Sequence, residues 1–339
     1  MQTITARNVH QALPEVMHMM KTMGHEFPSR NGPVLKVLGP VSICYQHPME
    51  RVMFWPERDA NPFFHILEAL WMLAGRDDVK FLADIVPRMA SFSDDGVSLN
   101  AAYGYRWRHH FGFDQLPPIA EALKKDRYDR RQVLSMWDAG HDLQRNTKDL
   151  PCNTQVFFSR TDTGALDMTV TNRSNDAVWG ALGANAVHFS MLQEYLAVMI
   201  GCSVGKYWQV TNNLHLYLDH HRALMDKMAA QAYPSQQFRR TCPYENGVVE
   251  VTNLIPSGDV ATFDRDVEMV LNDDVPLGIR DWFCRKAAIP MMLAIQTYKG
   301  TEMNQAQRVL AAQRILGDNM NLRSDWRLAA CNWLEKRNG

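Results

Sequence analysis

Residues 150–152 (LPC) and 172–176 (NRSND) decide the fold of this chain. Between them, residues 155–170 have the composition of two β-strands joined by a DTG turn, and such a hairpin returns Arg173 toward Cys152. A guanidinium beside a cysteine lowers the pKa of the thiol and can hold an anionic substrate against the thiolate. An isolated cysteine is more often a small buried apolar residue. It is the arginine, with the amides and carboxylate around it, that favours a nucleophile here.

Further motifs extend this pattern along the chain in a fixed order. They are SRNG at 29–32, EALW at 68–71, AYG at 102–104, RR at 130–131, SMW at 135–137, LPC at 150–152, RSND at 173–176 and HLY at 215–217. Together they resemble the thymidylate synthase family, including its pyrimidine-nucleotide hydroxymethylase branch. Each motif alone is weak, but eight in the family's order are not a coincidence.

The resemblance implies an α+β, thymidylate synthase-like fold with a large mixed β-sheet flanked by helices. We expect a single catalytic domain over residues 1–339, with a helical part from about residue 265 to the C-terminus. The family further implies a homodimer in which the sheet of one subunit packs against the sheet of the other. The strands expected from the sequence are grouped in the middle of the chain, as this fold requires.

Composition agrees with an intracellular enzyme. The chain has 339 residues, 46% of them hydrophobic, and a net charge of −1, so it can bury a large core but has no field to gather nucleic acid or anionic membrane. Six cysteines occur without a CxxC pair, which argues against a metal site and against a disulfide framework. We therefore expect no metal, no direct nucleic-acid contact, no membrane span, and a cytoplasmic location, in the host cytoplasm if the chain is phage-encoded.

Local patterns predict the main elements. Residues 61–75 begin with an Asn-Pro cap signal and carry apolar side chains at helical spacing, which places Glu68 inside an apolar helix. We expect further helices over 8–24, 186–200 and 282–297, and strands over 34–45, 132–137, 155–170 and 204–213.

Catalytic roles follow from the resemblance. Cys152 would add to C6 of a pyrimidine ring, which turns C5 into a carbon nucleophile toward the methylene group of 5,10-methylenetetrahydrofolate, the expected co-substrate. Neutral C5 is too weak a nucleophile to react without this covalent step. Glu68 would move protons through ordered water at the ring and the folate, Tyr103 would be the general base near C5, and Asp176 would contact the pterin.

Substrate contacts are also implied by the resemblance. Arg30, Arg173 and the pair Arg130 and Arg131 match a cluster that grips the nucleotide phosphate, with the pair reaching across the dimer interface. Several guanidinium forks suit a dianionic phosphate. His215 and Tyr217 alternate along an extended segment and can both reach the sugar 3′-hydroxyl. The remaining nucleotide-binding positions are Ser174, Asn172, Asn153 and Asn185, of which Asn185 falls where the family reads the edge of the base.

Four departures separate this chain from the synthase pattern. The interval from Gly180 to Asn185 is one residue longer, Asn153 replaces a histidine, and Met89 stands where a cofactor-flanking tryptophan is usual. Residues 332–339 (NWLEKRNG) lack the small apolar ending that closes a synthase pocket over folate. Hydride transfer needs a dry, closed site, because water readily captures the exocyclic methylene intermediate.

We therefore expect folate-dependent hydroxymethylation at C5 of a 2′-deoxypyrimidine 5′-monophosphate, with dUMP ahead of dCMP because Asn185 is an amide. One alternative is a thymidylate synthase or a related nucleotide C5-methyltransferase, which shares every step up to the methylene intermediate. Another, of a different class, is a catalytically inactive nucleotide-binding scaffold.

Overall fold

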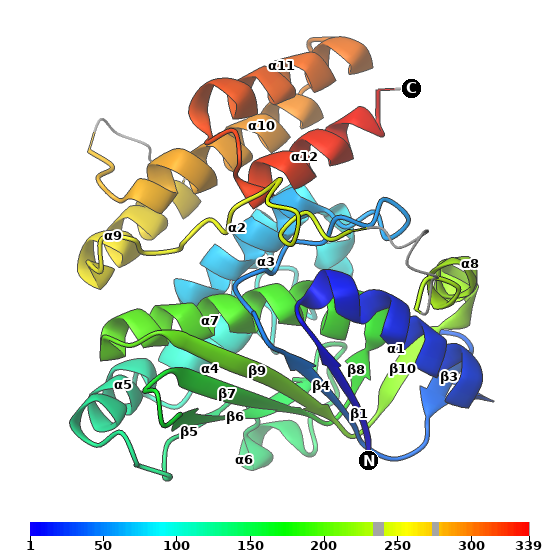
Figure 1. Cartoon of the computed structure of the whole chain (residues 1–339), viewed down its shortest axis with the longest axis vertical. Coiled ribbons are helices and arrows are strands. Elements are labelled where there is room, and N and C mark those ends of the chain that lie inside the picture. The colour runs from blue at the N-terminus through cyan, green and yellow to red at the C-terminus, as the bar shows by residue number, and fades with distance from the viewer. Residues whose placement is uncertain (233–240, 273–277, 339) are drawn as a thin grey trace. The chain divides into compact units, whose positions relative to one another are not determined.

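The computed structural model describes residues 1–232, 241–272 and 278–338, and it divides into two compact units (Figure 1). The first unit comprises Met1–Arg51, Arg106–Asn146 and Leu150–Cys242. The second comprises Val52–Tyr105, Thr147–Asp149 and Pro243–Gly339. Gly339, the last residue of the expected domain, lies outside the described residues.

A six-stranded mixed sheet, in the order β1-β4-β9-β7-β6-β5, forms the centre of the first unit. Its strands are β1 (Gln2–Ala6), β4 (Val41–Tyr45), β9 (Val204–Thr211), β7 (Leu166–Asn172), β6 (Asn153–Arg160) and β5 (Val133–Ser135). The β1–β4 and β7–β9 pairs are parallel and the other pairs are antiparallel. The β6–β7 hairpin turns at Gly164, whose φ of 89° suits a residue without a side chain.

A smaller sheet in the same unit carries several predicted site residues. Its order is β2-β3-β10-β8, with β2 (Gly24–Phe27), β3 (Val34–Val37), β10 (Leu214–Tyr217) and β8 (Asn175–Asp176). Because β8 and β10 pair in parallel with His215 opposite Asp176, two segments far apart in the sequence meet at this point.

Helices cover one face of the large sheet. α7 (Asn185–Ile200), which is buried along most of its length, packs on β7 and β9 and against α5 (Leu116–Lys125). α1 (Val9–Met23) begins at Asn8, whose side chain accepts a hydrogen bond from the Gln11 N–H. It packs against β1, β4 and α8 (Leu218–Ala229).

The opposite face of the large sheet is only partly covered in the single chain. Alternate residues of the central strands point to the two faces, and Phe157 and Val133, which pair across β6 and β5, are each 38% exposed. Thr169 and Trp208 continue the same row across β7 and β9 and are also incompletely buried.

The second unit is helical. Its elements are α2 (Pro62–Leu73), α3 (Val79–Ile85), η1 (Pro87–Phe92), α9 (Val260–Leu271), η4 (Cys284–Ala288), α10 (Ile289–Lys299), α11 (Gln305–Asn319) and α12 (Asp325–Glu335), and α4 (Tyr103–Arg108) begins in it. The Asn61 side chain caps α2 by accepting from the Phe64 N–H, 3.1 Å away. A Cβ atom on Gly104 would lie only 1.9 Å from the Met72 carbonyl oxygen, so the AYG motif needs glycine for close packing against the end of α2.

Most sequence predictions of elements are confirmed, and one is wrong. Residues 34–45 do not form a single strand. The chain bends at Gly39, whose φ is 82°, and β3 and β4 enter different sheets. The helix expected over 282–297 is present as the π-helical turn η4 followed by α10, and the helical C-terminal part already begins at Val260. The α+β class with a mixed sheet flanked by helices is confirmed.

Candidate active site

The thiol of Cys152 lies beside the guanidinium of Arg173 at the start of the β6–β7 hairpin. The Arg173 Nη2 atom is 3.7 Å from the Cys152 sulfur, and the Arg173 N–H donates to the Cys152 carbonyl at 2.9 Å. Arg173 also donates from Nε to the Pro151 carbonyl and from Nη2 to the Leu150 carbonyl, at 2.8 and 3.0 Å. The LPC segment therefore holds the guanidinium through its own carbonyls, and the positive charge stays next to the sulfur.

Trp137 supports this pair from one side. The Arg173 guanidinium lies over the Trp137 ring, 5.9 Å from its centroid. Both Met136 and Trp137 donate their backbone N–H groups to the Thr154 carbonyl, at 2.9 and 3.0 Å, which ties the SMW motif to the start of β6.

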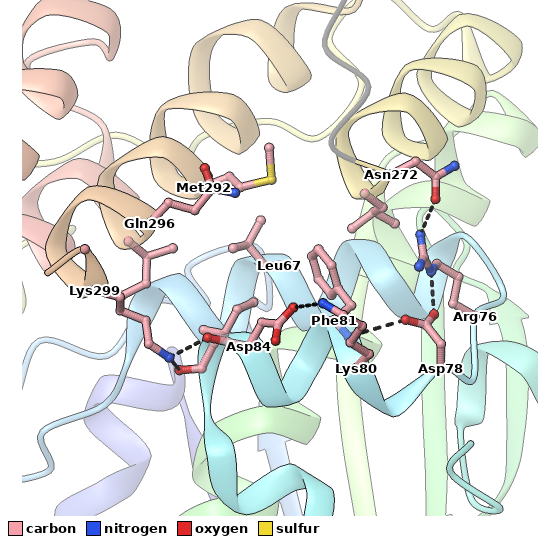
Figure 2. Close-up of a pocket in the computed structure, with 14 residues that line it drawn as sticks. Leu67, Arg76, Asp78, Lys80, Phe81, Asp84, Asn272, Met292, Gln296 and Lys299 are labelled. Carbon is pink, nitrogen blue, oxygen red and sulfur yellow. Dashed lines mark hydrogen bonds and ion pairs between the residues drawn. The ribbon is translucent and has the colours of Figure 1, made fainter. Parts of the chain in front are cut away.

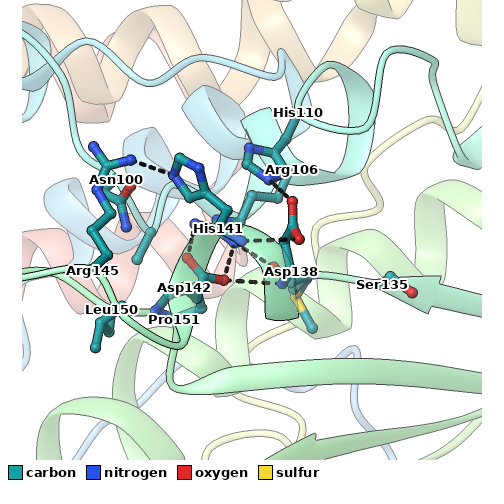
Figure 3. Close-up of polar contacts among 12 residues, drawn as sticks. Asn100, Arg106, His110, Ser135, Asp138, His141, Asp142, Arg145, Leu150 and Pro151 are labelled. Atoms are coloured by element: carbon teal, nitrogen blue, oxygen red, sulfur yellow. Dashed lines mark hydrogen bonds and ion pairs between the residues drawn. The ribbon is translucent and has the colours of Figure 1, made fainter.

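A buried ion pair holds the SMW motif in turn (Figure 3). Arg106 donates to the Met136 carbonyl and forms a two-pronged pair with Asp142 at 2.7 and 2.9 Å, and both side chains are inaccessible to solvent. Burial raises the pKa of the Asp142 carboxyl, but the hydrogen bonds and the charge of Arg106 outweigh burial, so the net shift is downward.

Four other cysteines lie in environments unsuited to nucleophilic attack. Burial raises the pKa of the thiols of Cys44, Cys202, Cys284 and Cys331. Cys152, in contrast, is partly exposed and lies next to a cation. The environments of these thiols thus favour Cys152 as the nucleophile.

Three of the predicted nucleotide-binding amides come together next to Cys152. Asn153 on β6 pairs with Asn172 on β7, and their side chains are hydrogen-bonded. Asn153 also donates to the Asn185 Oδ1 atom at 3.2 Å. Asn185 lies at the start of α7, after the turn η2 (Ala177–Ala184), in which Leu182 and Gly183 leave the helical conformation. The longer interval therefore forms an irregular π-helical turn that ends at Asn185.

The small sheet brings Ser174, Asp176, His215 and Tyr217 together. The Ser174 hydroxyl is 3.4 Å from His215 Nδ1, which also lies 3.3 Å from the Asn213 carbonyl. Because a carbonyl only accepts, Nδ1 is the donor in its contact with Asn213. The rings of His215 and Tyr217 meet edge to face at 5.3 Å, as the alternation along the strand predicts.

Asp176 has one engaged and one unengaged oxygen. Its Oδ1 accepts from the backbone N–H groups of Val178 and Trp179 and thereby caps η2. Its Oδ2 is buried and finds no hydrogen-bond partner within the described residues. A buried carboxylate oxygen of this kind fits a ligand that brings an N–H donor.

The other predicted arginines lie on loops of the first unit. Arg30 is exposed in the turn between β2 and β3, where Gly32 has a φ of 100° and donates its N–H to the Ser29 carbonyl. Arg130 and Arg131 precede β5 and are exposed. The Arg131 fork is hydrogen-bonded to Asp129, and these bonds lower the pKa of the Asp129 carboxyl.

Three further predicted residues belong to the second unit. Glu68 is 6% exposed on α2, among side chains that are nearly all buried. Tyr103 is partly buried at the start of α4, and Met89 is partly buried in η1. Glu68 is thus a buried carboxylate within an apolar helix, as the spacing predicts.

A pocket of about 570 Å³ in the second unit contains none of the predicted site residues (Figure 2). Leu67, Phe81 and Met292 line its apolar part. Its charged groups pair with their neighbours: Arg76 with Asp78 and Asn272, Lys80 with Asp84, and Lys299 with the Asp84 and Ile85 carbonyls. Because these charges are satisfied, we do not assign the pocket to the reaction.

The described residues contain neither a membrane-spanning helix nor a cluster of metal ligands. Among the helices of 1–232, 241–272 and 278–338, none combines the length and the apolar character needed to cross a membrane. In the same residues, no cluster of three or more histidine, cysteine, aspartate or glutamate side chains is arranged to hold a metal ion.

Sequence reasoning missed several residues that surround the predicted amides. Gln209 and Thr211 on β9 and Tyr45 on β4 lie on the buried face of the sheet and are hydrogen-bonded into the same network as Asn185. The available signal was a glutamine at an inward position between Tyr207 and Thr211, since polar side chains on a buried strand face need partners.

Comparison with known proteins places the chain in a family. Residues 55–247 match the sequence profile described as thymidylate synthase. A deoxyuridylate hydroxymethyltransferase of Pseudomonas phage M6 is 49% identical over 337 residues, which cover 99% of this chain and 95% of that protein. A protein of the same name from Bacillus phage SP01 is 40% identical over 213 residues, which cover 60% of this chain and 55% of that protein. Another, from Delftia phage PhiW-14, is 31% identical over 182 residues, which cover 50% of this chain and 50% of that protein. The resemblance inferred from the motifs is confirmed, and the chain belongs to the thymidylate synthase family.

Proposed function

We propose that this chain is a deoxyuridylate hydroxymethyltransferase, which places a hydroxymethyl group on C5 of dUMP. The enzyme class, a one-carbon transferase, is indicated by the family and by relatives named for this activity. The observation that carries the proposal is the Cys152 thiol next to the Arg173 guanidinium, with Asn185 tied into the same hairpin. We further propose that residues 1–339 act as one catalytic domain, because the M6 relative matches over 337 residues.

Cys152 is proposed to add to C6 of the pyrimidine. Arg173 holds positive charge beside the sulfur and favours its thiolate form. Addition at C6 makes C5 nucleophilic, and Tyr103 accepts the C5 proton after C5 has bonded to the one-carbon unit. Glu68 moves protons through water at O4 of the ring, a role that suits a buried carboxylate.

We propose that 5,10-methylenetetrahydrofolate binds as co-substrate and supplies the one-carbon unit. The buried Oδ2 atom of Asp176 fits an N–H donor of a pterin ring, and Met89 and Glu68 are the other proposed contacts. In the proposed sequence C5 bonds to the methylene carbon of the folate, and tetrahydrofolate leaves as C5 loses its proton. Water then adds to the exocyclic methylene group, and elimination of the Cys152 sulfur from C6 releases the hydroxymethylated product. Hydroxymethylation rather than methylation is supported by the relatives named deoxyuridylate hydroxymethyltransferase.

For the phosphate, we propose a cluster of Arg30, Arg173, and Arg130 and Arg131 from a second subunit. Arg131 has a side chain that is 84% exposed in the single chain, as a group that acts on another subunit would be. The partly covered sheet face with Phe157 and Val133 supports a sheet-to-sheet homodimer, because exposed apolar side chains in a row favour association.

The rest of the nucleotide is assigned to the remaining polar residues. His215 and Tyr217 hold the 3′-hydroxyl, with Ser174 beside the imidazole ring. Asn185 reads the edge of the base, with Asn153 and Asn172 bound behind it. We propose a cytoplasmic location, which is the host cytoplasm if the chain is phage-encoded as its relatives are.

Analysis of the folate coproduct tests the proposal. The protein is incubated with dUMP and methylenetetrahydrofolate, and nucleotide and folate products are identified by mass spectrometry. Hydroxymethyl-dUMP with tetrahydrofolate is expected. Thymidylate with dihydrofolate would instead identify a synthase or related C5-methyltransferase, and no product from a protein that still binds dUMP would identify an inactive scaffold. The same assay with dCMP measures the base preference.

A further inference from the structure

Five side-chain amides form one continuous hydrogen-bonded row in the buried part of the first unit. Asn172 donates to Asn153, Asn153 donates to Asn185 at 3.2 Å, Asn185 donates to Asn175 at 3.0 Å, and Asn175 donates to Gln209 at 3.0 Å. None of the five is more than 7% exposed. In each link an Nδ2 atom donates to the oxygen of the next amide, so the row has a single direction.

One main-chain carbonyl fixes that direction. The Gln209 Nε2 atom donates to the Ala181 carbonyl at 2.8 Å, and a carbonyl oxygen only accepts. Tyr45 reinforces the arrangement, because its hydroxyl donates to the same carbonyl at 2.7 Å and accepts from Gln209 at 3.3 Å. The Gln209 oxygen must therefore face Asn175, and each further amide of the row must take the matching orientation, with its NH2 group toward the oxygen of the next amide.

The other end of the row does not impose a direction. Thr211 donates its hydroxyl to the Asn172 Oδ1 atom at 3.0 Å. A hydroxyl can equally accept a hydrogen bond by rotating its proton, so Thr211 would adapt to a reversed row. Of the two ends, only the Gln209 end can hold the orientation of Asn185.

The geometry of η2 makes the row continuous. Ala181, which supplies the anchoring carbonyl, belongs to the irregular turn that carries the extra residue before Asn185. A Cβ atom on Gly180 would lie 2.1 Å from the Asn175 Oδ1 atom and 3.2 Å from the Asn185 Nδ2 atom. Glycine at this position leaves the space in which the Asn175 and Asn185 amides meet.

We propose that Gln209 is a specificity-determining residue that selects uracil over cytosine by orienting the amide of Asn185. This inference rests on the proposed function, in which Asn185 reads the base. Uracil presents an acceptor at O4 and a donor at N3, whereas cytosine presents a donor at N4 and an acceptor at N3. Rotation of the Asn185 amide by a half turn exchanges its donor and acceptor and hence its complementarity from one base to the other.

The cost of reversing the whole row sets the selectivity. A reversed row would place the Gln209 oxygen against the Ala181 carbonyl, which exchanges a buried hydrogen bond for two facing acceptors. Such a buried mismatch corresponds to a factor of about 5 to 150 in an equilibrium constant. Gln209 lies behind Asn175 and acts through it, so we regard it as a positioning residue.

The test removes either end of the row by an isosteric substitution. Gln209→Met removes the amide that is hydrogen-bonded to the Ala181 carbonyl. Either direction of the remaining row then leaves one polar atom of Asn175 unpaired, so the two directions become nearly equal in free energy. We expect the ratio of kcat/KM for dUMP to kcat/KM for dCMP to fall at least fivefold. Thr211→Val deletes a buried hydrogen bond of similar strength at the far end, and we expect this ratio to change less than twofold. Gln209→Glu is the rescue variant, since a buried neutral carboxyl can still donate to Ala181 and accept from Asn175.

Dissociation constants for dUMP and dCMP, measured by calorimetry without folate, give a second readout that does not depend on turnover. A lower dUMP preference in Gln209→Met, with the preference retained in Thr211→Val and Gln209→Glu, supports the inference. An unchanged preference in folded Gln209→Met, or an equal fall in Gln209→Met and Thr211→Val, overturns it even if the enzyme hydroxymethylates dUMP. If the unmodified enzyme forms no product, the proposed function fails, and the ratio of dissociation constants still decides the role of Gln209. If Gln209→Met does not fold, Gln209→Asn, which withdraws the amide from Ala181, is measured with the same two criteria.

Discussion

Replacing Asp142 by asparagine should destabilise the first unit strongly. The Arg106 and Asp142 side chains are both inaccessible to solvent and joined at 2.7 and 2.9 Å. Asparagine preserves the shape of the carboxylate but leaves the guanidinium charge buried without a counter-ion. Breaking a buried pair in this way costs about 3–5 kcal/mol of unfolding free energy.

Urea unfolding followed by tryptophan fluorescence measures this loss. With a slope of about 3 kcal/mol per molar urea, the midpoint should fall by roughly 1 M or more. Asp226→Asn is the control in the same unit, because the Lys21–Asp226 pair has side chains that are 49% and 50% exposed, and we expect it to change the midpoint little. The double variant Arg106→Met with Asp142→Leu should recover much of the loss, since it removes both charges.

The contribution of Asp142 to the unfolding free energy should decrease at acidic pH. The pKa of Asp142 is lowered in the folded protein, so its contribution to stability is complete above the unfolded pKa of about 3.9 and is lost as the pH falls through the folded value. The difference between the unmodified protein and Asp142→Asn should therefore be constant from about pH 5 to pH 8 and shrink below about pH 4. A loss under 1 kcal/mol at pH 7, or a difference that grows in acid, would refute the reasoning.

Three predictions concern activity. Cys152→Ser should abolish turnover in the coproduct assay while calorimetry still detects dUMP binding, because the phosphate contacts survive; near-normal turnover would exclude Cys152 as the nucleophile. Mixing inactive Cys152→Ser chains with inactive Arg131→Ala chains should restore activity if Arg131 acts on the partner's nucleotide, and no recovery after subunit exchange, verified by native mass spectrometry, would count against a shared site. Asn185→Asp should lower kcat/KM for dUMP at least tenfold more than for dCMP, because a carboxylate opposes O4 of uracil but suits cytosine, and an unchanged ratio would mean that Asn185 does not read the base.

Helices and strands were predicted correctly where the sequence carries a clear cap, turn or apolar-spacing signal. The Asn61 cap and apolar spacing located α2 and the burial of Glu68, and the DTG turn located the β6–β7 hairpin that returns Arg173 to Cys152. Residues 34–45 were wrongly predicted as one strand, although they contain Gly39 followed by Pro40. A Gly-Pro pair marks a turn, and the chain bends at Gly39 so that the two halves enter different sheets.

The sequence named candidate site residues but not the hydrogen bonds that join them. The motifs named Asn153, Asn172 and Asn185, yet their hydrogen-bond partner Gln209 lies on β9 and is joined to them through Asn175. Such links depend on the order of strands in the sheet, which the sequence does not state. The direction of the amide row depends further on one carbonyl in η2, which no residue-type pattern encodes.

The close approach of Gly180 to Asn175 limits which substitutions can accumulate at these two positions during evolution. Position 180 is restricted by a neighbouring side chain, since a Cβ atom there would come within 2.1 Å of the Asn175 amide oxygen. Alanine at 180 is therefore expected to be harmful beside Asn175 but tolerated after Asn175 has changed to serine or alanine. The effect of alanine at position 180 should therefore depend on the residue at 175, and in a lineage position 175 should change before position 180.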